Sequence, residues 1–255
     1  MEFPRAAALS PRFVVRERTG STNADLVAAA TAAPHEWPHL SVLLTTDQTA
    51  GRGRLDRVWT APAGSALAVS VLVRVPGIPV ASRGWIPLVA GAAMTRAVAA
   101  QLPGVHQAGL KWPNDVLVDG LKVCGILAEA IGGDAVVVGS GVNTRMAGTD
   151  LPVPTATSFS ALGLPVDEDV LLADYLTALD EQLTALATLH DAGAAGVRAE
   201  VEALCLTLGR DVAVSLPGGD LLRGRAQRID GDGRLVVASG SGETAVSAGD
   251  VVHVR

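Results

Sequence analysis

The chain has 255 residues, of which 49% are hydrophobic, and it carries a formal net charge of −6 at pH 7. This length and composition favour a folded globule with a large buried core and argue against a disordered chain. The acidic balance argues against broad nucleic-acid binding as the main task, although it leaves room for a local basic pocket.

The sequence gives no sign of a membrane span or an export signal. The longest apolar run, residues 85–102, is interrupted by Pro87 and Arg96, and a bilayer span needs about 20 apolar residues. The N-terminal residues lack the continuous apolar region of a secretory signal. The two cysteines, Cys124 and Cys205, form neither a metal-binding spacing nor a disulfide framework. We therefore expect a cytoplasmic protein that does not bind membranes.

The first part of the chain is predicted to combine strands and helices. The polar residues STN at 21–23 precede an Ala-rich segment, and such residues typically cap the start of a helix. Apolar runs bounded by Gly and Pro predict strands over 41–46 and 65–75. Residues 84–102 have helical length and an Ala-rich composition, so they predict a core helix.

The rest of the chain is predicted to contain an antiparallel sheet, two helices and a small barrel. Four short strand-like segments are joined by tight DG and GGD turns: 109–112, 116–118, 122–130 and 135–141. Apolar spacings of three and four predict a helix over 170–189, and a shorter one follows over 195–205. After residue 206, alternating segments with turns at 217–220, 230–233 and 239–242 predict a small β-barrel. We therefore expect two domains, 1–205 and 206–255.

One long segment between two predicted strands, DQTAGRGRLDRVWTAPAG at 47–64, has no apolar period and is predicted to be a functional loop. Its glycines, Gly51 and Gly53, let backbone amides approach an oxyanion. Its arginines, Arg52, Arg54 and Arg57, supply forked donors suited to phosphate or carboxylate. We interpret the segment as an anion cradle, and the alternative is a solvated loop with incidental arginines.

Lys111 and Lys122 are the only lysines of the chain, beside eighteen arginines. Pro113 keeps Trp112 out of the helical region, so Lys111 is predicted at a strand end with Asn114 and Asp115 in the following turn. A rigid position suits a group that stabilises charge. An ammonium group is a compact point charge, whereas guanidinium is a wide planar fork. The alternative reading of this motif is a packed turn.

These motifs, in this order, resemble the biotin protein ligase family. The matching segments are STN at 21–23, DQTAGRGR at 47–54 with Trp59 after it, KWPND at 111–115, KVCGIL at 122–127 with Glu129, GSGVN at 139–143 and SAGDVV at 247–252. The resemblance implies an α+β fold, in which a mixed β-sheet catalytic domain flanked by helices, of the class II synthetase and biotin-lipoate ligase type, precedes an SH3-like β-barrel.

The resemblance also implies a reaction in two steps. The biotin carboxylate attacks the α-phosphate of ATP to give biotinyl-5'-AMP and pyrophosphate, and a lysine of a biotin carboxyl carrier protein then takes the biotinyl group. Biotin and ATP are the expected substrates, with Mg²⁺ accompanying ATP. Because two anions must meet in the first step, cations are needed where charge concentrates. Lys111 is expected to bridge the carboxylate and the α-phosphate as one point charge.

The resemblance implies site roles at the matching positions. The residues expected to act in catalysis are Lys111, Arg52 and Arg54. Those expected to bind biotin are Ser21, Thr22, Asn23, Gln48, Gly51, Arg52, Gly53, Lys111 and Gly125. Those expected to bind the nucleotide are Arg54, Trp59, Lys111, Asn114, Lys122 and Asn143. Lys122 is the open case, facing either phosphate or solvent, and no metal ligand is expected from the protein.

The arginine-rich loop is also expected to be mobile without ligand and to close over the adenylate, which would protect the mixed anhydride from water. The chain departs from the family pattern at Leu55 and Asp56, where a basic residue and glycine are frequent, so the closed form can differ. Only twenty residues precede Ser21, too few for the winged-helix DNA-binding domain of some members. We therefore expect a ligase without DNA binding, as a monomer or weak homodimer.

Three other functions compete with this interpretation. A lipoate-protein ligase or octanoyltransferase-like enzyme would share the fold class, but the GRGR and KWPND segments resemble the biotin branch. A regulator that senses biotinyl-AMP is disfavoured by the short N-terminal segment and the acidic charge. A binding protein without turnover is disfavoured by the presence of Lys111.

Overall fold

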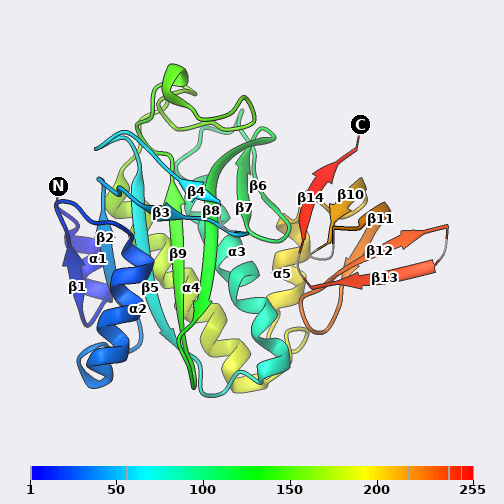
Figure 1. Ribbon diagram of the computed structural model, residues 1–255, viewed down its shortest axis with the longest axis horizontal. Coiled ribbons are helices and arrows are strands. Elements are labelled where there is room, and N and C mark those ends of the chain that lie inside the picture. Colours follow the sequence, from blue (N-terminus) through cyan, green and yellow to red (C-terminus); the bar gives the residue numbers. More distant parts are fainter. Residues whose placement is uncertain (1, 56, 217–218, 241, 248, 255) are drawn as a thin grey trace.

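The structure is a computed structural model that describes residues 2–55, 57–216, 219–240, 242–247 and 249–254. Its main sheet has seven strands in the order β1-β2-β5-β9-β8-β7-β6 (Figure 1). Their bounds are β1 Phe13–Val15, β2 Ser41–Thr45, β5 Leu67–Arg74, β6 Ala108–Lys111, β7 Asp115–Val118, β8 Leu121–Ala130 and β9 Ala135–Val142. Only β1 and β2 run parallel among these neighbours, so the sheet is mixed, as predicted.

All six strands predicted for this part of the chain are confirmed, with small shifts of their ends. One shift concerns Asp115, which begins β7 instead of lying in the turn after Lys111. The sequence did not predict β1, because three residues at the edge of a sheet carry too short a pattern to recognise.

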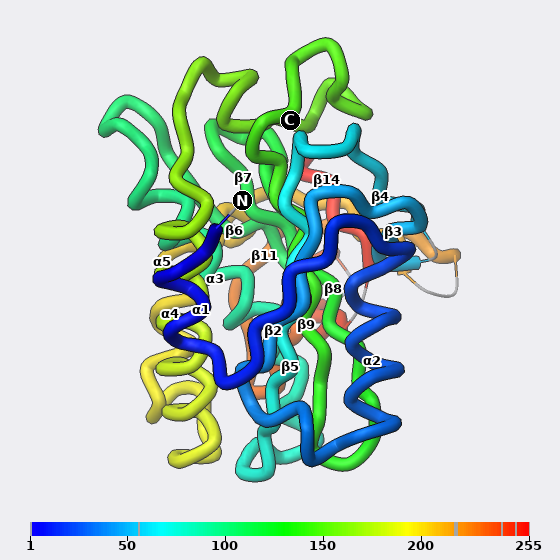
Figure 2. The backbone as a smooth tube through the Cα atoms, turned by 90° about the vertical axis from the view of Figure 1, so that its left-hand side faces the viewer, coloured from blue at the N-terminus to red at the C-terminus, as the bar shows by residue number. Residues whose placement is uncertain are grey.

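Helices cover both faces of the main sheet (Figure 2). The α-helices are α1 Pro4–Leu9, α2 Thr22–Ala32, α3 Trp85–Ala100, α4 Glu168–Leu189 and α5 Val197–Leu204, and the 3₁₀ turns are η1 Pro34–Glu36, η2 Val80–Gly84 and η3 Gly148–Asp150. The four predicted helices are confirmed. Alternation along β2 explains the two layers: Val42 and Leu44 pack in the cluster with α3 and α4, and Leu43 packs in the cluster with α2.

The segment predicted as a loop contains a short antiparallel pair, β3 (Gly51–Arg52) and β4 (Val58–Trp59). Gly51 opposes Trp59 in this hairpin, and the Gly53 N–H donates to the Arg57 carbonyl at 2.6 Å. This hairpin could not be predicted from the sequence, because each of its strands has only two residues. The residue between Leu55 and Arg57, Asp56, lies outside the described residues, so its predicted effect on the cradle stays a prediction.

A second sheet of five antiparallel strands follows in the order β13-β12-β11-β10-β14 (Figure 1). Its strands are β10 Asp211–Ser215, β11 Leu221–Ile229, β12 Leu235–Ser239, β13 Gly242–Val246 and β14 Asp250–His253. The predicted turn at 230–233 joins β11 to β12. The turns at 217–220 and 239–242 each include residues outside the described ranges.

The second sheet packs against the first without a separate core. One hydrophobic cluster includes Leu110 of β6, Met94 of α3, and Val212 and Val237 of the second sheet. Two buried indoles also cross the junction, since Trp85 Nε1 donates to the Gly231 carbonyl at 2.8 Å and Trp112 Nε1 to the Gly233 carbonyl at 3.3 Å. Within the described residues, no helix is long and apolar enough to cross a membrane.

Candidate active site

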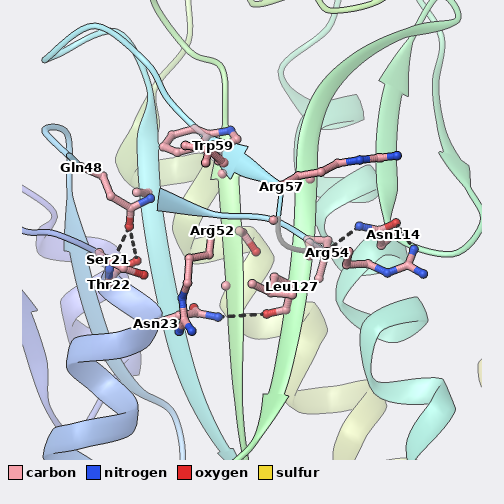
Figure 3. A pocket seen from close by; sticks show the side chains of 18 of the residues that line it. Ser21, Thr22, Asn23, Gln48, Arg52, Arg54, Arg57, Trp59, Asn114 and Leu127 are labelled. Carbon is pink, nitrogen blue, oxygen red and sulfur yellow. Dashed lines mark hydrogen bonds between the residues drawn. The ribbon is translucent and has the colours of Figure 1, made fainter. Parts of the chain in front are cut away.

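A cavity of about 180 Å³ lies between the central strands and the β3–β4 hairpin (Figure 3). The predicted site residues that line it are Ser21, Thr22, Asn23, Gln48, Arg52, Gly53, Arg54, Trp59, Asn114, Lys122 and Gly125. Three other predicted residues, Gly51, Lys111 and Asn143, are not part of this lining. Most of the predicted residues, drawn from four separate motifs, therefore meet in one place.

Small residues on the α2 side of the sheet create this space. Register places Ser70 opposite Gly139 and Ala68 opposite Gly141. On the same face Leu43 lies opposite Ser70, and the next row holds Leu72 opposite Val137, where α2 covers them. The change from large to small side chains leaves a hollow beyond the start of the helix.

The glycines of β9 are required by their neighbours. A Cβ atom on Gly139 would lie 2.3 Å from Asn23 Oδ1, and one on Gly141 would lie 2.8 Å from Cε2 of Trp59. The Asn23 side chain and the Trp59 ring therefore rest directly on the strand. This close approach explains the GSG sequence.

A polar network forms the floor of the cavity near the start of α2. Ser21 caps the helix, because its side chain accepts from the Ala24 N–H. Gln48 Oε1 accepts from the Thr22 backbone N–H at 2.8 Å and from the Thr22 hydroxyl at 3.1 Å (Figure 3). The Ser70 hydroxyl lies 2.8 Å from Thr22 Oγ1 and 2.5 Å from Asn23 Oδ1.

Ser70 was absent from the sequence-based site, although its signal was present. It is the single polar residue within the apolar segment LAVSVLV of β5, and it is fully buried. A buried hydroxyl needs a hydrogen-bond partner, so a lone serine in a core strand indicates a polar neighbour packed on that face of the sheet, here Thr22 and Asn23 of α2.

Each described arginine of the hairpin has a partner outside it. Arg52 donates to Glu129 Oε2 at 3.0 Å, and Asn23 Nδ2 donates to the same oxygen at 2.7 Å. Glu129 therefore joins the floor to the hairpin. Arg57 forms an ion pair with Asp250 at the start of β14. Asp250 lines the cavity, and sequence analysis gave it no role.

Arg54 lies deepest of the three arginines. It donates to Asn114 Oδ1 at 2.8 Å and to the Gly249 carbonyl at 3.2 Å. Burial lowers the pKa of its guanidinium, and Asp115 opposes that shift. Arg54 thus connects the hairpin to the KWPND turn of the first sheet and to the edge of the second.

The two lysines differ in position. Lys122 lines the cavity, where its Nζ lies 2.5 Å from Asp115 Oδ1. The end of its side chain lies close to Gly125. Lys111 ends β6, and burial lowers the pKa of its ammonium group, with Asp115 opposing and Lys122 and Arg57 adding to the shift. The sequence-based assignment of the central cation to Lys111 stays a prediction, and Lys122 is a second ammonium group, placed in the cavity wall.

Gly51 and Asn143 each stabilise the local course of the backbone. A Cβ atom on Gly51 would lie 2.4 Å from Gln48 Nε2 and from the Trp59 carbonyl oxygen, so glycine is needed for the hairpin to form. Asn143 follows β9, where its Nδ2 donates to the Thr157 carbonyl at 2.9 Å. It fixes the chain after β9 and does not belong to the wall of the cavity.

The electrostatic character of the cavity follows from its charged residues. Its lining contains four cations, Arg52, Arg54, Arg57 and Lys122, and two anions, Asp115 and Asp250. No group of three or more His, Cys, Asp or Glu residues suited to a metal ion occurs in the part of the chain that the structure describes. The cavity can therefore hold a ligand with a polar head on the floor and an anionic group toward the cations.

Fold and site together define an α+β protein whose cavity, beneath an arginine-rich hairpin, suits a small anionic ligand, and whose chain continues into a small antiparallel domain. The chain belongs to the biotin/lipoate A/B protein ligase family, whose model matches residues 15–143. The model of the biotin protein ligase C-terminal domain matches residues 207–254. The family recognised from the sequence motifs is therefore confirmed.

Similar proteins agree with this assignment. The biotin--[acetyl-CoA-carboxylase] ligase of Mycobacterium tuberculosis is 42% identical over 241 residues, which cover 93% of this chain and 87% of the relative. The enzyme of the same name from Paracoccus denitrificans is 31% identical, over 92% of this chain and 97% of its own. A structure of the biotin protein ligase from Aquifex aeolicus in complex with biotin and ATP has a TM-score of 0.77 at 24% identity, covering 96% of this chain and 99% of that chain. The last likeness establishes the shared fold.

Proposed function

We propose that this protein is a biotin--[acetyl-CoA-carboxylase] ligase that forms biotinyl-5'-AMP from biotin and ATP and transfers biotin to a lysine of a biotin carboxyl carrier protein. The observation that carries the proposal is the cavity, which joins a polar floor to a cationic wall under a hairpin able to cover it. Two relatives that match nearly the whole chain bear this enzyme name.

The floor suits the head of biotin. Its cyclic urea offers two N–H donors and one carbonyl acceptor, and the floor presents amide and hydroxyl groups from Thr22, Asn23 and Gln48, with the buried Ser70 hydrogen-bonded behind them. Their mutual hydrogen bonds hold these groups in place before the ligand arrives, which lowers the cost of ordering on binding. A biotin head seated there would direct its carboxylate toward Lys122 and the hairpin.

In the first step, a biotin carboxylate oxygen forms a bond to the α-phosphorus of ATP, and the bond from that phosphorus to the pyrophosphate oxygen breaks. Two anions approach each other, so positive charge must be fixed near the reacting oxygens. Lys122 supplies a compact charge in the cavity wall, and Arg52 and Arg54 supply forked donors from the hairpin side. Lys111 adds positive potential beside Asp115.

In the second step, the carrier's lysine amine attacks the biotinyl carbonyl, AMP leaves with the bonding electrons, and the amine loses a proton. Until then the mixed anhydride must be kept from water. The described arginines of the hairpin already contact Glu129, Asn114, Gly249 and Asp250. These contacts favour the closed position of the hairpin.

Mg²⁺ enters this proposal with ATP. The described residues supply no group of three or more metal-binding side chains, and Mg²⁺ in nucleotide sites is commonly held by phosphate oxygens and water with one or two carboxylates. Asp115 and Asp250 are the carboxylates of the cavity that could take part. The ion would offset phosphate charge during attack.

A lipoate-protein ligase is the second candidate, because the matched family model includes lipoate ligases. Two observations favour biotin: the match of residues 207–254 to the biotin protein ligase C-terminal domain, and the names of the similar proteins. We treat the chain as a catalytic domain over 1–205 with this smaller domain over 206–255.

The proposal is tested by acceptor modification. The purified chain is incubated with Mg-ATP, a biotin carboxyl carrier domain and either biotin or lipoate, and the carrier mass is measured. Biotin addition that requires ATP and the acceptor lysine supports the proposal. Lipoate addition without biotin addition would assign the chain to the lipoate branch.

A further inference from the structure

The positively charged residues of this chain are arginine almost throughout. Of its twenty basic residues, eighteen are arginine, and the lysines are Lys111 and Lys122. Lys122 lines the cavity, and Lys111 ends β6, which pairs with β7 beside the cavity. No other position of the sequence supplies a side-chain amine. The remaining surface of the molecule therefore carries its positive charge as guanidinium groups.

Amines and guanidinium groups differ in how they react with an acyl adenylate. A lysine amine that has lost its proton attacks an activated carbonyl, which is the step by which the carrier's lysine is proposed to accept biotin. A guanidinium group keeps its proton in proteins, and its charge is delocalised over a planar fork, so it offers no free electron pair for such an attack. Arginine thus supplies positive charge beside an adenylate without becoming an acceptor of its acyl group.

Arg57 is the arginine at which this difference has the most direct consequence. It lines the cavity together with Arg52 and Arg54 (Figure 3), and its side chain is 64% exposed. Its guanidinium group forms an ion pair with Asp250, which lines the cavity as well. A side chain at this position is therefore open to solvent and also adjoins the contents of the cavity.

We propose that the use of arginine around the cavity protects this chain from modifying itself, and that Arg57→Lys would create an acceptor of biotin within the enzyme. The inference rests on the proposed function. In the variant, the new amine would attack the biotinyl carbonyl of biotinyl-5'-AMP, the bond from that carbonyl to the phosphate oxygen would break, AMP would leave with the bonding electrons, and the amine would lose a proton to solvent. In the unchanged chain this competing acceptor does not exist, so the biotinyl group passes to the carrier.

The two natural lysines are held next to one carboxylate. Lys122 Nζ lies 2.5 Å from Asp115 Oδ1, and Gly125 leaves space for the end of this side chain. Lys111 lies opposite Asp115 in the register of β6 and β7. Both ammonium groups are therefore beside an anion that binds them. We expect neither lysine to take up biotin in the unchanged chain.

The test compares Arg57→Lys with Arg96→Lys in the full chain. Arg96 is a matched control, because its side chain is 59% exposed and pairs with Glu200. It belongs to α3, which packs on the face of the main sheet opposite to α2 and the cavity. Both variants and the unchanged chain receive the same concentration of synthetic biotinyl-5'-AMP without carrier. Peptide mass mapping at successive times then locates the modified side chains.

We expect Arg57→Lys to gain biotin at position 57 at least about tenfold faster than Arg96→Lys gains it at position 96, because the cavity holds the adenylate beside the amine. Arg52→Lys, a second variant in the cavity wall, should also be modified faster than Arg96→Lys. Unfolding the variants in urea should make the rates equal, since no cavity then holds the adenylate. The unchanged chain should carry no biotin on its lysines over the same period.

Two results would overturn the proposal. Equal rates for both cavity variants and Arg96→Lys in the folded state would mean that a lysine at the cavity is not at risk. Modification of Lys111 or Lys122 in the unchanged chain, as fast as that of Arg57→Lys, would mean that arginine gives no protection. Absence of pyrophosphate release by the unchanged chain with biotin and Mg-ATP would instead contradict the proposed function, so the two failures are distinguishable.

Discussion

At the scale of single residues, the proposed adenylation step depends on which lysine places its positive charge near the reacting oxygens. Both Lys111 and Lys122 lie near Asp115, but the Lys122 ammonium is the one in the cavity wall. Sequence analysis assigned this charge to Lys111 because it precedes a rigid turn, and that assignment stays a prediction. The place of Lys122 in the cavity wall could not be predicted, because it depends on how β8 pairs with β7 and β9.

Replacing each lysine by arginine separates their roles. Lys122→Arg keeps the charge but widens it beside Gly125, where Lys122 Nζ already lies 2.9 Å from the position of an added Cβ atom. We expect adenylate formation to fall by about 10²–10³, the usual cost of losing one stabilising group. Lys111→Arg should cost much less. Single-turnover formation of biotinyl-AMP checks this, and a larger loss in the Lys111 variant would support the sequence-based assignment and contradict the role proposed for Lys122.

Glu129 offers a second test at this scale. Glu129→Gln preserves an oxygen that accepts from Asn23 Nδ2 but weakens the pairing with Arg52. We expect faster escape of biotinyl-AMP from the enzyme and more biotin on bystander lysines, because the hairpin loses one of its contacts. The control is Glu243→Gln, which disturbs an ion pair with Arg228 in the second sheet. Equal escape rates in both variants would remove Glu129 from this role.

At the scale of elements, the cavity exists because β9 carries glycine where neighbouring rows carry large side chains. Gly139→Ala would place a Cβ atom 2.3 Å from Asn23 Oδ1 and displace the amide. We expect biotin binding to weaken roughly tenfold or more, since unpairing a buried polar group costs about 1–3 kcal/mol. Gly104→Ala is the control, because its added Cβ atom has no neighbour within 4 Å. Calorimetric titration with biotin measures both, and unchanged binding by Gly139→Ala would show that the strand tolerates a side chain there.

Helices and strands with long hydrophobic patterns were predicted correctly from the sequence. The apolar runs of β2 and β5 and the periodic helix α4 were predicted with small errors at their ends. The strands β1, β3 and β4 were not, since two or three residues carry no period and their pairing depends on distant partners. Asp250 was missed because its partner lies far along the chain, and Ser70 was missed although a lone serine in an apolar strand was a signal.

At the scale of the whole molecule, the two sheets share one hydrophobic cluster, so we expect them to unfold together. The two cysteines can show whether the sheets unfold together, because Cys124 lies in β8 and Cys205 lies at the junction of the sheets. Both are buried. Burial raises the pKa of the Cys124 thiol to about 12 and also raises that of Cys205. Both thiols therefore stay neutral and unreactive in the folded chain at pH 8.

Alkylation with iodoacetamide in increasing urea should then label both cysteines with one midpoint. Labelling of Cys205 at clearly lower urea would mean that the second sheet detaches first. The raised thiol pKa values also set a pH trend. The folded thiols stay neutral while those of the unfolded chain ionise above about pH 8.5, so the free energy of unfolding should fall as pH rises from there toward 12.

The most direct test of the central claim is pyrophosphate release from Mg-ATP in the absence of any carrier, with biotin, lipoate and octanoate supplied separately. The cavity, with its polar floor and cationic wall, predicts release with biotin alone, in a burst that stops near one equivalent per enzyme because the adenylate is retained. Release with lipoate or octanoate in place of biotin, or no release with any of the three, would contradict the account.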